Sequence, residues 1–268
     1  MGSEMCIRDR GTGNRDRQGC HAMAKTLHEW LQTDVARVRA KPMRWLSERH
    51  FFRDPSRAVY SDADYFFPPA DGIVLYAKEV DPTGEIIDIK GRSYSLKSAL
   101  RDPAFDKRCL VVGIFMTFYD VHVNRVPYAG RLCYREIDAI DTYNYPMIEV
   151  EKDLLEELAP FTRRAGYLFN NQRVVNRVFS LELGQHYYVL QVADYDVDCI
   201  TPFRLKQNQV FAQNQRFSMI RYGSQVDLII PLSGQYLYTP VLGAAMHVEA
   251  GIDPLVRITD KGKSTAFH

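Results

Sequence analysis

The first regular pattern of hydrophobic and polar positions begins at Met23. Hydrophobic side chains then recur at helical spacing, at Leu27, Trp30, Leu31, Val35 and Val38. This periodicity predicts an amphipathic helix. Pro42 cannot continue that helix, so we expect it to open a second short helix that carries Met43, Trp45 and Leu46. Residues 23–57 are therefore predicted to be a helical segment.

Short β-type runs dominate the chain after residue 58. They lie at 72–77, 85–90, 110–115, 187–192 and 226–230, and turns rich in Pro, Asp and Gly separate several of them. Helices are predicted at 96–100 and at 151–159, the second ending near Pro160. The pattern predicts an α+β fold, with one β-rich domain over residues 58–268 behind the N-terminal helical segment.

Two further segments have their own character. Residues 1–22 are rich in Gly and Arg and lack hydrophobic periodicity, so we expect a disordered or non-native tail. Residues 241–251 resemble the hammerhead hairpins of biotinyl and lipoyl domains, but no lysine stands at the tip for modification. We therefore expect this C-terminal hairpin, and its His247, to serve the fold.

The charge balance is nearly neutral, with 34 Lys and Arg against 33 Asp and Glu, which argues against nucleic-acid binding. The basic residues are unevenly distributed, however, because seven lie between Arg37 and Arg57. Both tryptophans fall in the same helical segment. Basic residues and Trp on an amphipathic helix suit an anionic membrane surface. Packing of that helix on its own domain is the alternative.

The five cysteines are widely spaced and form no C-x-x-C pair, which argues against a disulfide framework, a zinc site or another metal site. A reducing compartment fits this cysteine usage. No stretch approaches the roughly 18 apolar residues that a membrane-spanning helix needs. The N-terminus has no apolar signal-peptide core.

Three segments join a reactive side chain to a turn or strand end. Asp71 stands in a Pro-Pro-Ala-Asp-Gly turn before a strand, where an Asp ordinarily caps its own backbone. A polar group follows the buried run at 110–118 and comprises Asp120, His122, Asn124 and Arg125. Polar residues at the end of a core strand favour a functional role. The Gly223–Ser224 pair between two apolar strands is, by itself, most simply a bend.

Together and in this order, these segments resemble the phosphatidylserine decarboxylase family of pyruvoyl-dependent enzymes. The resemblance is carried by residues 66–72, 89–96, 120–127, 189–193 and 216–224. Each match is short, but the five occur in the family's order and span most of the chain.

The resemblance implies a proenzyme that cleaves itself between Gly223 and Ser224, inside a catalytic domain of residues 58–268. Ser224 Oγ would attack the Gly223 carbonyl, and elimination would then leave a pyruvoyl group in place of Ser224. A serine hydroxyl needs a base to activate it and a group to orient that base. Asp71 and His122 match the family's pair for these tasks. A β chain would end at Gly223, and an α chain would begin with the pyruvoyl group.

The activity implied by the resemblance is that of a carboxy-lyase. Phosphatidylserine would form a Schiff base with the pyruvoyl group and lose CO2 to give phosphatidylethanolamine, with His122 as the candidate proton donor. Two positions depart from the family pattern. Arg125 stands where many members have a second histidine, and Gln225 follows the serine in place of Thr or Arg. Arg125 and Asn124 are candidates for a charge or substrate-binding role.

The expected partners are a phospholipid substrate, an anionic membrane surface and the α and β chains of one proenzyme; a homodimer is left open. We expect a peripheral membrane protein on the cytoplasmic side, in an organelle or membrane that the sequence does not define. Two alternatives stay open. One is a pyruvoyl decarboxylase of a soluble amino acid, and the other is a non-cleaving homologue that binds a lipid or a partner.

Overall fold

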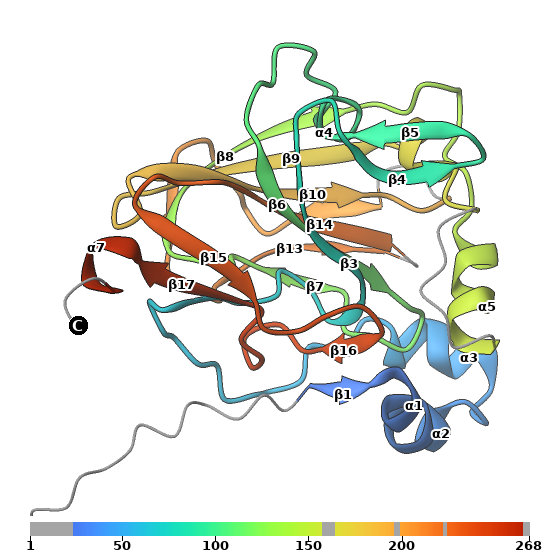
Figure 1. Ribbon diagram of the computed structural model, residues 1–268. Coiled ribbons are helices and arrows are strands. Elements are labelled where there is room, and N and C mark those ends of the chain that lie inside the picture. The colour runs from blue at the N-terminus through green and yellow to red at the C-terminus, as the bar shows by residue number, and fades with distance from the viewer. Residues whose placement is uncertain (1–23, 157–163, 196–198, 222–223, 265–268) are drawn as a thin grey trace, which may run out of the picture.

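A nine-stranded antiparallel sheet is the centre of the fold (Figure 1). The computed structural model describes residues 24–156, 164–195, 199–221 and 224–264, so the predicted tail, the predicted end of the helix at 151–159 and Gly223 lie outside the described residues. The strands, in sheet order, are β1 (Lys25–Thr26), β16 (Met246–Val248), β3 (Gly72–Val80), β6 (Cys109–Met116), β14 (Ser224–Pro231), β10 (Gln185–Val192), β9 (Arg173–Ser180), β8 (Gly130–Ile137) and β12 (Gln209–Phe211).

The two faces of this sheet pack against different hydrophobic clusters. All of β6 is buried, and its side chains alternate between the clusters because successive residues of a strand point to opposite faces. Val111 and Phe115 join the first cluster, whereas Val112, Ile114 and Met116 join the second. A strand with both faces covered is a continuous hydrophobic run, which is why the sequence identifies β6 so clearly.

Smaller elements surround the large sheet. One three-stranded sheet has the order β11 (Ile200–Pro202), β13 (Arg216–Ile220), β7 (Val123–Arg125), and another has the order β15 (Tyr236–Pro240), β17 (Val256–Asp260), β2 (Tyr65–Phe66). A hairpin joins β4 (Glu85–Ile89) and β5 (Arg92–Ser95). The remaining helices outside the N-terminal segment are α4 (Leu96–Leu100), α5 (Ile148–Glu156), α6 (Tyr167–Asn170) and α7 (Lys261–Ser264).

Most of the predicted helical segment is helical, over 27–38 and 43–50, whereas residues 51–57 lie outside the helices. A continuous helix contains α1 (Leu27–Trp30), the π-helical η1 (Leu31–Val35) and α2 (Ala36–Val38). Thr26 caps it, because its hydroxyl accepts from Glu29 N while the Glu29 carboxylate accepts from Thr26 N. Pro42 directly precedes α3 (Met43–Trp45), which continues into η2 (Leu46–His50).

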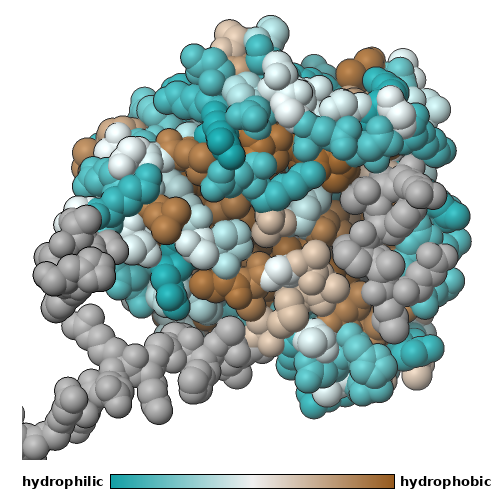
Figure 2. All heavy atoms as spheres, viewed as in Figure 1, coloured by the Kyte–Doolittle hydropathy of each residue, from teal (hydrophilic) through white to brown (hydrophobic). Residues whose placement is uncertain are grey.

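The hydrophobic side of this segment packs on the domain. Leu27, Trp30 and Val35 belong to the first hydrophobic cluster, and the Trp30 ring stacks on His247 at 4.5 Å between ring centroids. In Figure 2, the outer side of α1 and α2 is largely hydrophilic. The helix therefore uses its apolar face within the molecule. No helix in the described part of the chain combines the length and hydrophobicity that crossing a bilayer requires.

The predicted α+β class, with a β-rich domain behind a helical segment, is confirmed. The runs at 72–77, 85–90, 110–115, 187–192 and 226–230 fall in β3, β4, β6, β10 and β14, and α4 has the predicted bounds. Helix α5 begins at Ile148, three residues before the predicted start. Near the C-terminus β15 pairs with β17, and the connection between them contributes β16 to the large sheet.

Candidate active site

Ser224 stands at the first position of β14, in the interior. It lies opposite Met116, the last residue of β6, and its side chain is fully buried. The Ser224 hydroxyl donates to Met116 Sδ at 3.3 Å. A thioether sulfur is a weak acceptor, so this contact holds the hydroxyl only loosely. The bond that is predicted to be cut joins Ser224 to Gly223, and Gly223 lies outside the described residues.

His122 lies on an adjoining segment and is also fully buried. Its Nδ1 is 3.1 Å from the Asp120 carbonyl oxygen, and its ring stacks on Phe51 at 3.9 Å between centroids. A carbonyl oxygen can only accept, so Nδ1 carries the proton and Nε2 is left as a bare acceptor. Nε2 has no hydrogen-bond partner among the described residues. Ile220 N donates to the His122 carbonyl, which ties His122 to the strand that leads toward Ser224.

Burial lowers the pKa of His122 to about 4, against a smaller opposing effect from Asp120. The ring is therefore neutral at physiological pH. A neutral, buried imidazole with a free Nε2 is able to accept a proton, which is the first requirement for a general base.

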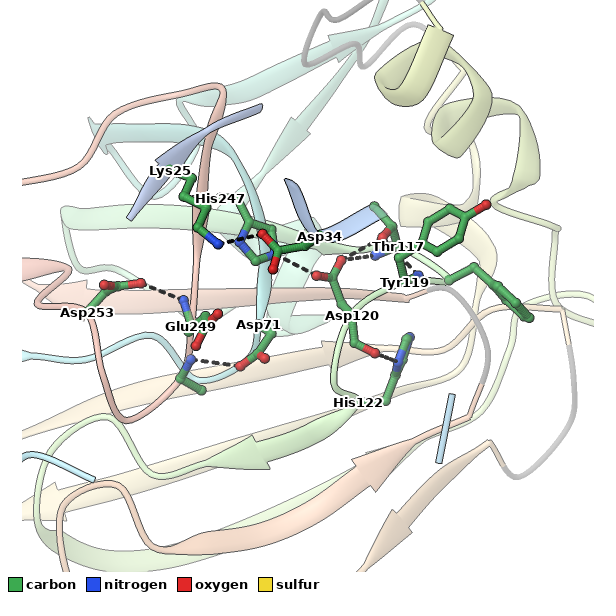
Figure 3. A network of polar contacts seen from close by, with 12 residues as sticks. Lys25, Asp34, Asp71, Thr117, Tyr119, Asp120, His122, His247, Glu249 and Asp253 are labelled. Carbon is green, nitrogen blue, oxygen red and sulfur yellow. Dashed lines mark hydrogen bonds and ion pairs between the residues drawn. The ribbon is translucent and has the colours of Figure 1, made fainter. Parts of the chain in front are cut away.

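Asp120 lies between two histidines (Figure 3). Its carboxylate Oδ1 is 2.6 Å from His247 Nε2, and its Oδ2 accepts from both Thr117 N and Thr117 Oγ1 at 2.7 Å. Burial opposes ionisation of both partners. The contact with His247, with help from Thr117, nevertheless holds the pKa of Asp120 below its usual value, and Asp120 raises that of His247. We conclude that this is a buried, charged pair.

Asp71 takes part in a different ion pair. Its carboxylate binds the Arg57 guanidinium through two contacts of 2.9 Å and accepts from Ala250 N at 2.8 Å. Within the described residues, Asp71 and His122 form no hydrogen bond with each other. The proposed orienting role of Asp71 thus stays a prediction, and the contact that orients His122 comes from Asp120 instead.

The sequence alone does not predict the ion pair between Asp120 and His247. Asp120 belongs to the polar group after β6, but its partner is 127 residues further along the chain and was assigned to the fold alone. No local pattern links the two positions. They meet because β16 lies beside β3, and β3 lies beside β6.

Asn124 and Arg125 lie in different surroundings. Asn124 Nδ2 donates weakly to Met116 Sδ at 3.7 Å, so Asn124 and Ser224 share one acceptor. Gln191 Nε2 donates to Asn124 Oδ1. Arg125 instead donates to the Asn214 carbonyl at 2.9 Å and lies 4.0 Å from Asp54. Asn124 and Ser224 therefore both contact Met116, whereas Arg125 bonds the loop that contains Asn214.

A cavity of about 390 Å³ lies between the N-terminal helices and the loop that carries Asp120. Its walls include Arg37, Arg53 and Arg57 together with Asp120 and His247. Neither Ser224 nor His122 lines it. The described residues contain no cluster of side chains suited to holding a metal ion.

A buried serine at the start of a strand, with a neutral histidine on an adjoining segment, is an arrangement suited to nucleophilic attack. The comparison with known families then defines the kind of enzyme. Residues 49–251 match the family model described as phosphatidylserine decarboxylase, and the chain belongs to that family of carboxy-lyases.

Curated relatives agree with this assignment. The chain is 29% identical over 212 residues to a "Phosphatidylserine decarboxylase proenzyme" of Erythrobacter litoralis, covering 78% of this chain and 72% of that one. It is 32% identical over 183 residues to a "Putative archaetidylserine decarboxylase proenzyme" of Methanocaldococcus jannaschii, covering 68% and 77%. A "Phosphatidylserine decarboxylase proenzyme" of Nitratidesulfovibrio vulgaris is 27% identical over 213 residues, covering 80% and 78%.

Proposed function

We propose that this chain is a proenzyme that cleaves itself at Gly223–Ser224 and then decarboxylates phosphatidylserine on an anionic membrane surface. Two observations carry the proposal. The buried Ser224 hydroxyl is only loosely held, and His122, whose carbonyl bonds the strand that leads toward Ser224, is neutral with an Nε2 that is unpartnered among the described residues. The names of the curated relatives, which describe serine-lipid decarboxylase proenzymes, support the choice of substrate.

Cleavage begins when His122 Nε2 takes the hydroxyl proton of Ser224. The Oγ atom attacks the Gly223 carbonyl carbon, the C–N bond breaks, and the released nitrogen takes up a proton, leaving an ester. Loss of the Cα proton of Ser224 then expels Gly223 as a carboxylate. Addition of water and loss of ammonia convert the remaining residue into the pyruvoyl group. Burial keeps the His122 ring neutral at physiological pH, so its Nε2 is available to accept the Ser224 hydroxyl proton.

The residues around Ser224 fit a small carbonyl group. Among the described residues, Asn124 Nδ2 has only the weak Met116 acceptor, so its amide can turn a donor toward a new oxygen at this position. Full burial of Ser224 keeps this position out of contact with bulk solvent. When formed, the pyruvoyl group supplies a carbonyl that engages the substrate amine and withdraws the electrons released with CO2.

The cavity beneath the N-terminal helices is our candidate site for the phosphate of the lipid headgroup, because neither Ser224 nor His122 lines it. Arg37 and Arg53 supply positive charge for a phosphate, whereas the Arg57 guanidinium is already held by Asp71. Asp120 and His247 form part of the wall. The helical segment above it exposes basic side chains, and Met43 is 69% exposed. We propose that this outer side, rather than the buried apolar side, meets the membrane.

Intact-mass analysis of the purified protein tests the cleavage. We expect two fragments, the smaller beginning with a blocked residue at 224, and a single uncut chain in the Ser224→Ala variant. Ser180→Ala, at a buried serine of β9, is the matched control and should cleave normally. A single full-length species of the unmodified protein after prolonged incubation would favour the non-cleaving homologue.

Vesicle binding tests the membrane surface. Arg44→Glu with Arg49→Glu reverses two exposed charges without touching the core, whereas deleting residues 23–57 would remove the buried Trp30 and Phe51. We expect the double variant to lose binding to anionic vesicles. Equal CO2 release from free serine and from phosphatidylserine would instead favour the soluble amino acid as substrate.

A further inference from the structure

We propose that Gln225, Tyr76, Asp227 and Tyr167 form a positioning device for the self-cleavage site. We call these four residues the Gln225 cluster. The proposal rests on the proposed function, because it assigns a role to the residue that follows Ser224. The cluster holds the backbone at the start of β14, so that Ser224 is correctly aimed before cleavage and the pyruvoyl end is held afterwards.

The cluster depends on a glycine in the middle of the sheet. Tyr76 of β3 and Asp227 of β14 both lie opposite Gly113 of β6, so the three residues form one row across three strands. The Tyr76 ring occupies the space over Gly113, where an added Cβ would lie 2.3 Å from a ring carbon. A register shift in β3 between Val74 and Tyr76 accompanies this placement. The phenol thereby reaches across β6 to Asp227.

The side chain of Gln225 is fixed at both ends. Its Oε1 accepts from Tyr167 OH at 2.6 Å, and its Nε2 donates to Tyr76 OH and to Asp227 Oδ1, each at 2.7 Å. Tyr76 OH also lies 3.1 Å from both Asp227 oxygens. Gln225 and Asp227 are fully buried, and Tyr167 comes from helix α6 on the same side of the sheet. A fully satisfied buried network specifies one geometry.

Gln225 acts on Ser224 through the backbone. Neighbouring residues of a strand point to opposite faces, so Gln225 faces the first hydrophobic cluster and Ser224 the second. Within the described strands, Ser224 pairs with Met116 alone, whereas Gln225 pairs with Phe115 on one side and Val192 on the other. Gln225 is therefore the first residue of β14 that is held by neighbours on both sides and by its own side chain.

Cleavage makes this anchoring important. Once the Gly223–Ser224 bond is cut, the reactive group becomes a chain end, and chain ends fray unless they are tied down. The new end carries no ammonium group that could form an ion pair. The Gln225 cluster lies one residue away and keeps that end in register with β6.

Removal of single hydroxyl groups tests the proposal. Tyr167→Phe deletes the donor to Gln225 Oε1, and Tyr76→Phe deletes the hydroxyl shared by Gln225 and Asp227. Tyr187→Phe is the matched control, because Tyr187 is fully buried and its hydroxyl bonds the backbone of Tyr128, away from the site. The measurements are the half-time of proenzyme cleavage, kcat and KM of the processed enzyme, and the urea midpoint.

We expect both test variants to lengthen the cleavage half-time and lower kcat about tenfold, with KM unchanged, while the control alters only the urea midpoint.

Cleavage and kcat at the unmodified level in Tyr167→Phe and Tyr76→Phe would overturn the positioning role and leave the proposed function intact. Equal slowing in all three variants would show a general stability effect and overturn it too. Absence of cleavage in the unmodified protein would instead overturn the proposed function. Should Tyr76→Phe fold poorly, the milder Tyr167→Phe decides.

Discussion

Two buried polar clusters flank Ser224, and they satisfy their hydrogen bonds differently. The Gln225 cluster uses both ends of the Gln225 amide within the strands. The second group, which we call the His122 cluster, comprises Asp120, His122 and His247, and it leaves His122 Nε2 unpartnered within the described chain. Leaving a buried polar atom unpaired costs about 1–3 kcal/mol, and at His122 this leaves a proton acceptor free. Under the function and the positioning role that we propose, this difference separates a group that reacts from a group that positions.

The same burial has opposite consequences for the two titrating groups. It lowers the pKa of His122 to about 4 and raises the pKa of Asp227 to about 6. In each case burial favours the neutral form. The Asp120–His247 pair remains charged by comparison, because each partner stabilises the charge of the other.

The largest expected effect follows from removing the free imidazole. His122→Ala should slow cleavage by about 10²–10⁴-fold, the usual contribution of a general base. The measurement is the time course of proenzyme cleavage by intact mass. His186→Ala, at a partly buried histidine of β10, is the control and should cleave at the normal rate. Normal cleavage in the His122 variant would place the base elsewhere and remove the chemical contrast between the clusters.

Breaking the charged pair comes next. Asp120→Asn leaves His247 buried without its counter-ion, and breaking such a pair costs about 3–5 kcal/mol in unfolding free energy. Urea denaturation of the uncleaved Ser224→Ala background measures it. Glu48→Gln, in the exposed pair with Arg44, should change stability by less than about 0.5 kcal/mol. A loss in Asp120→Asn no larger than in this control would show that the buried pair contributes little.

The two clusters also differ in how far the sequence predicts them. Asp120 and His122 stand out because they follow the buried run of β6, which is itself recognisable from its unbroken hydrophobic pattern. Ser224 is identified only through the family resemblance. His247 and Tyr76 give no such signal, since their partners are more than 100 residues away. Gln225 appears in the sequence only as a departure from a family pattern. Strand order and register, which local periodicity does not encode, bring these residues together.

The change of folding stability with pH should have opposite signs for the titrating groups of the two clusters. The unfolded state binds more protons at His122 between about pH 4 and 6.5, so this residue makes stability rise with pH there. Asp227 is protonated only in the folded state between about pH 4 and 6, so it makes stability fall with pH over nearly the same range. Each contribution is at most about 3 kcal/mol.

Two variants in the Ser224→Ala background measure these contributions. The stability difference between the background and His122→Gln should grow in favour of the background as pH rises from 4 to 6.5. The difference between the background and Asp227→Asn should shrink from 4 to 6. A change with pH in the same direction for both stability differences would contradict the contrast between the clusters.

The smallest expected effect tests the glycine that lets the Gln225 cluster form. Gly113→Ala places a methyl group against the Tyr76 ring, and overpacking of this kind costs about 1–3 kcal/mol. Gly166→Ala is the control, because an added Cβ there meets nothing within 4 Å and its backbone is already helical. Since the Tyr76 hydroxyl must shift away from Gln225, Gly113→Ala should also slow cleavage, in proportion to Tyr76→Phe. A loss of stability with unchanged cleavage would show that the row across β3, β6 and β14 supports the fold without aiming Ser224.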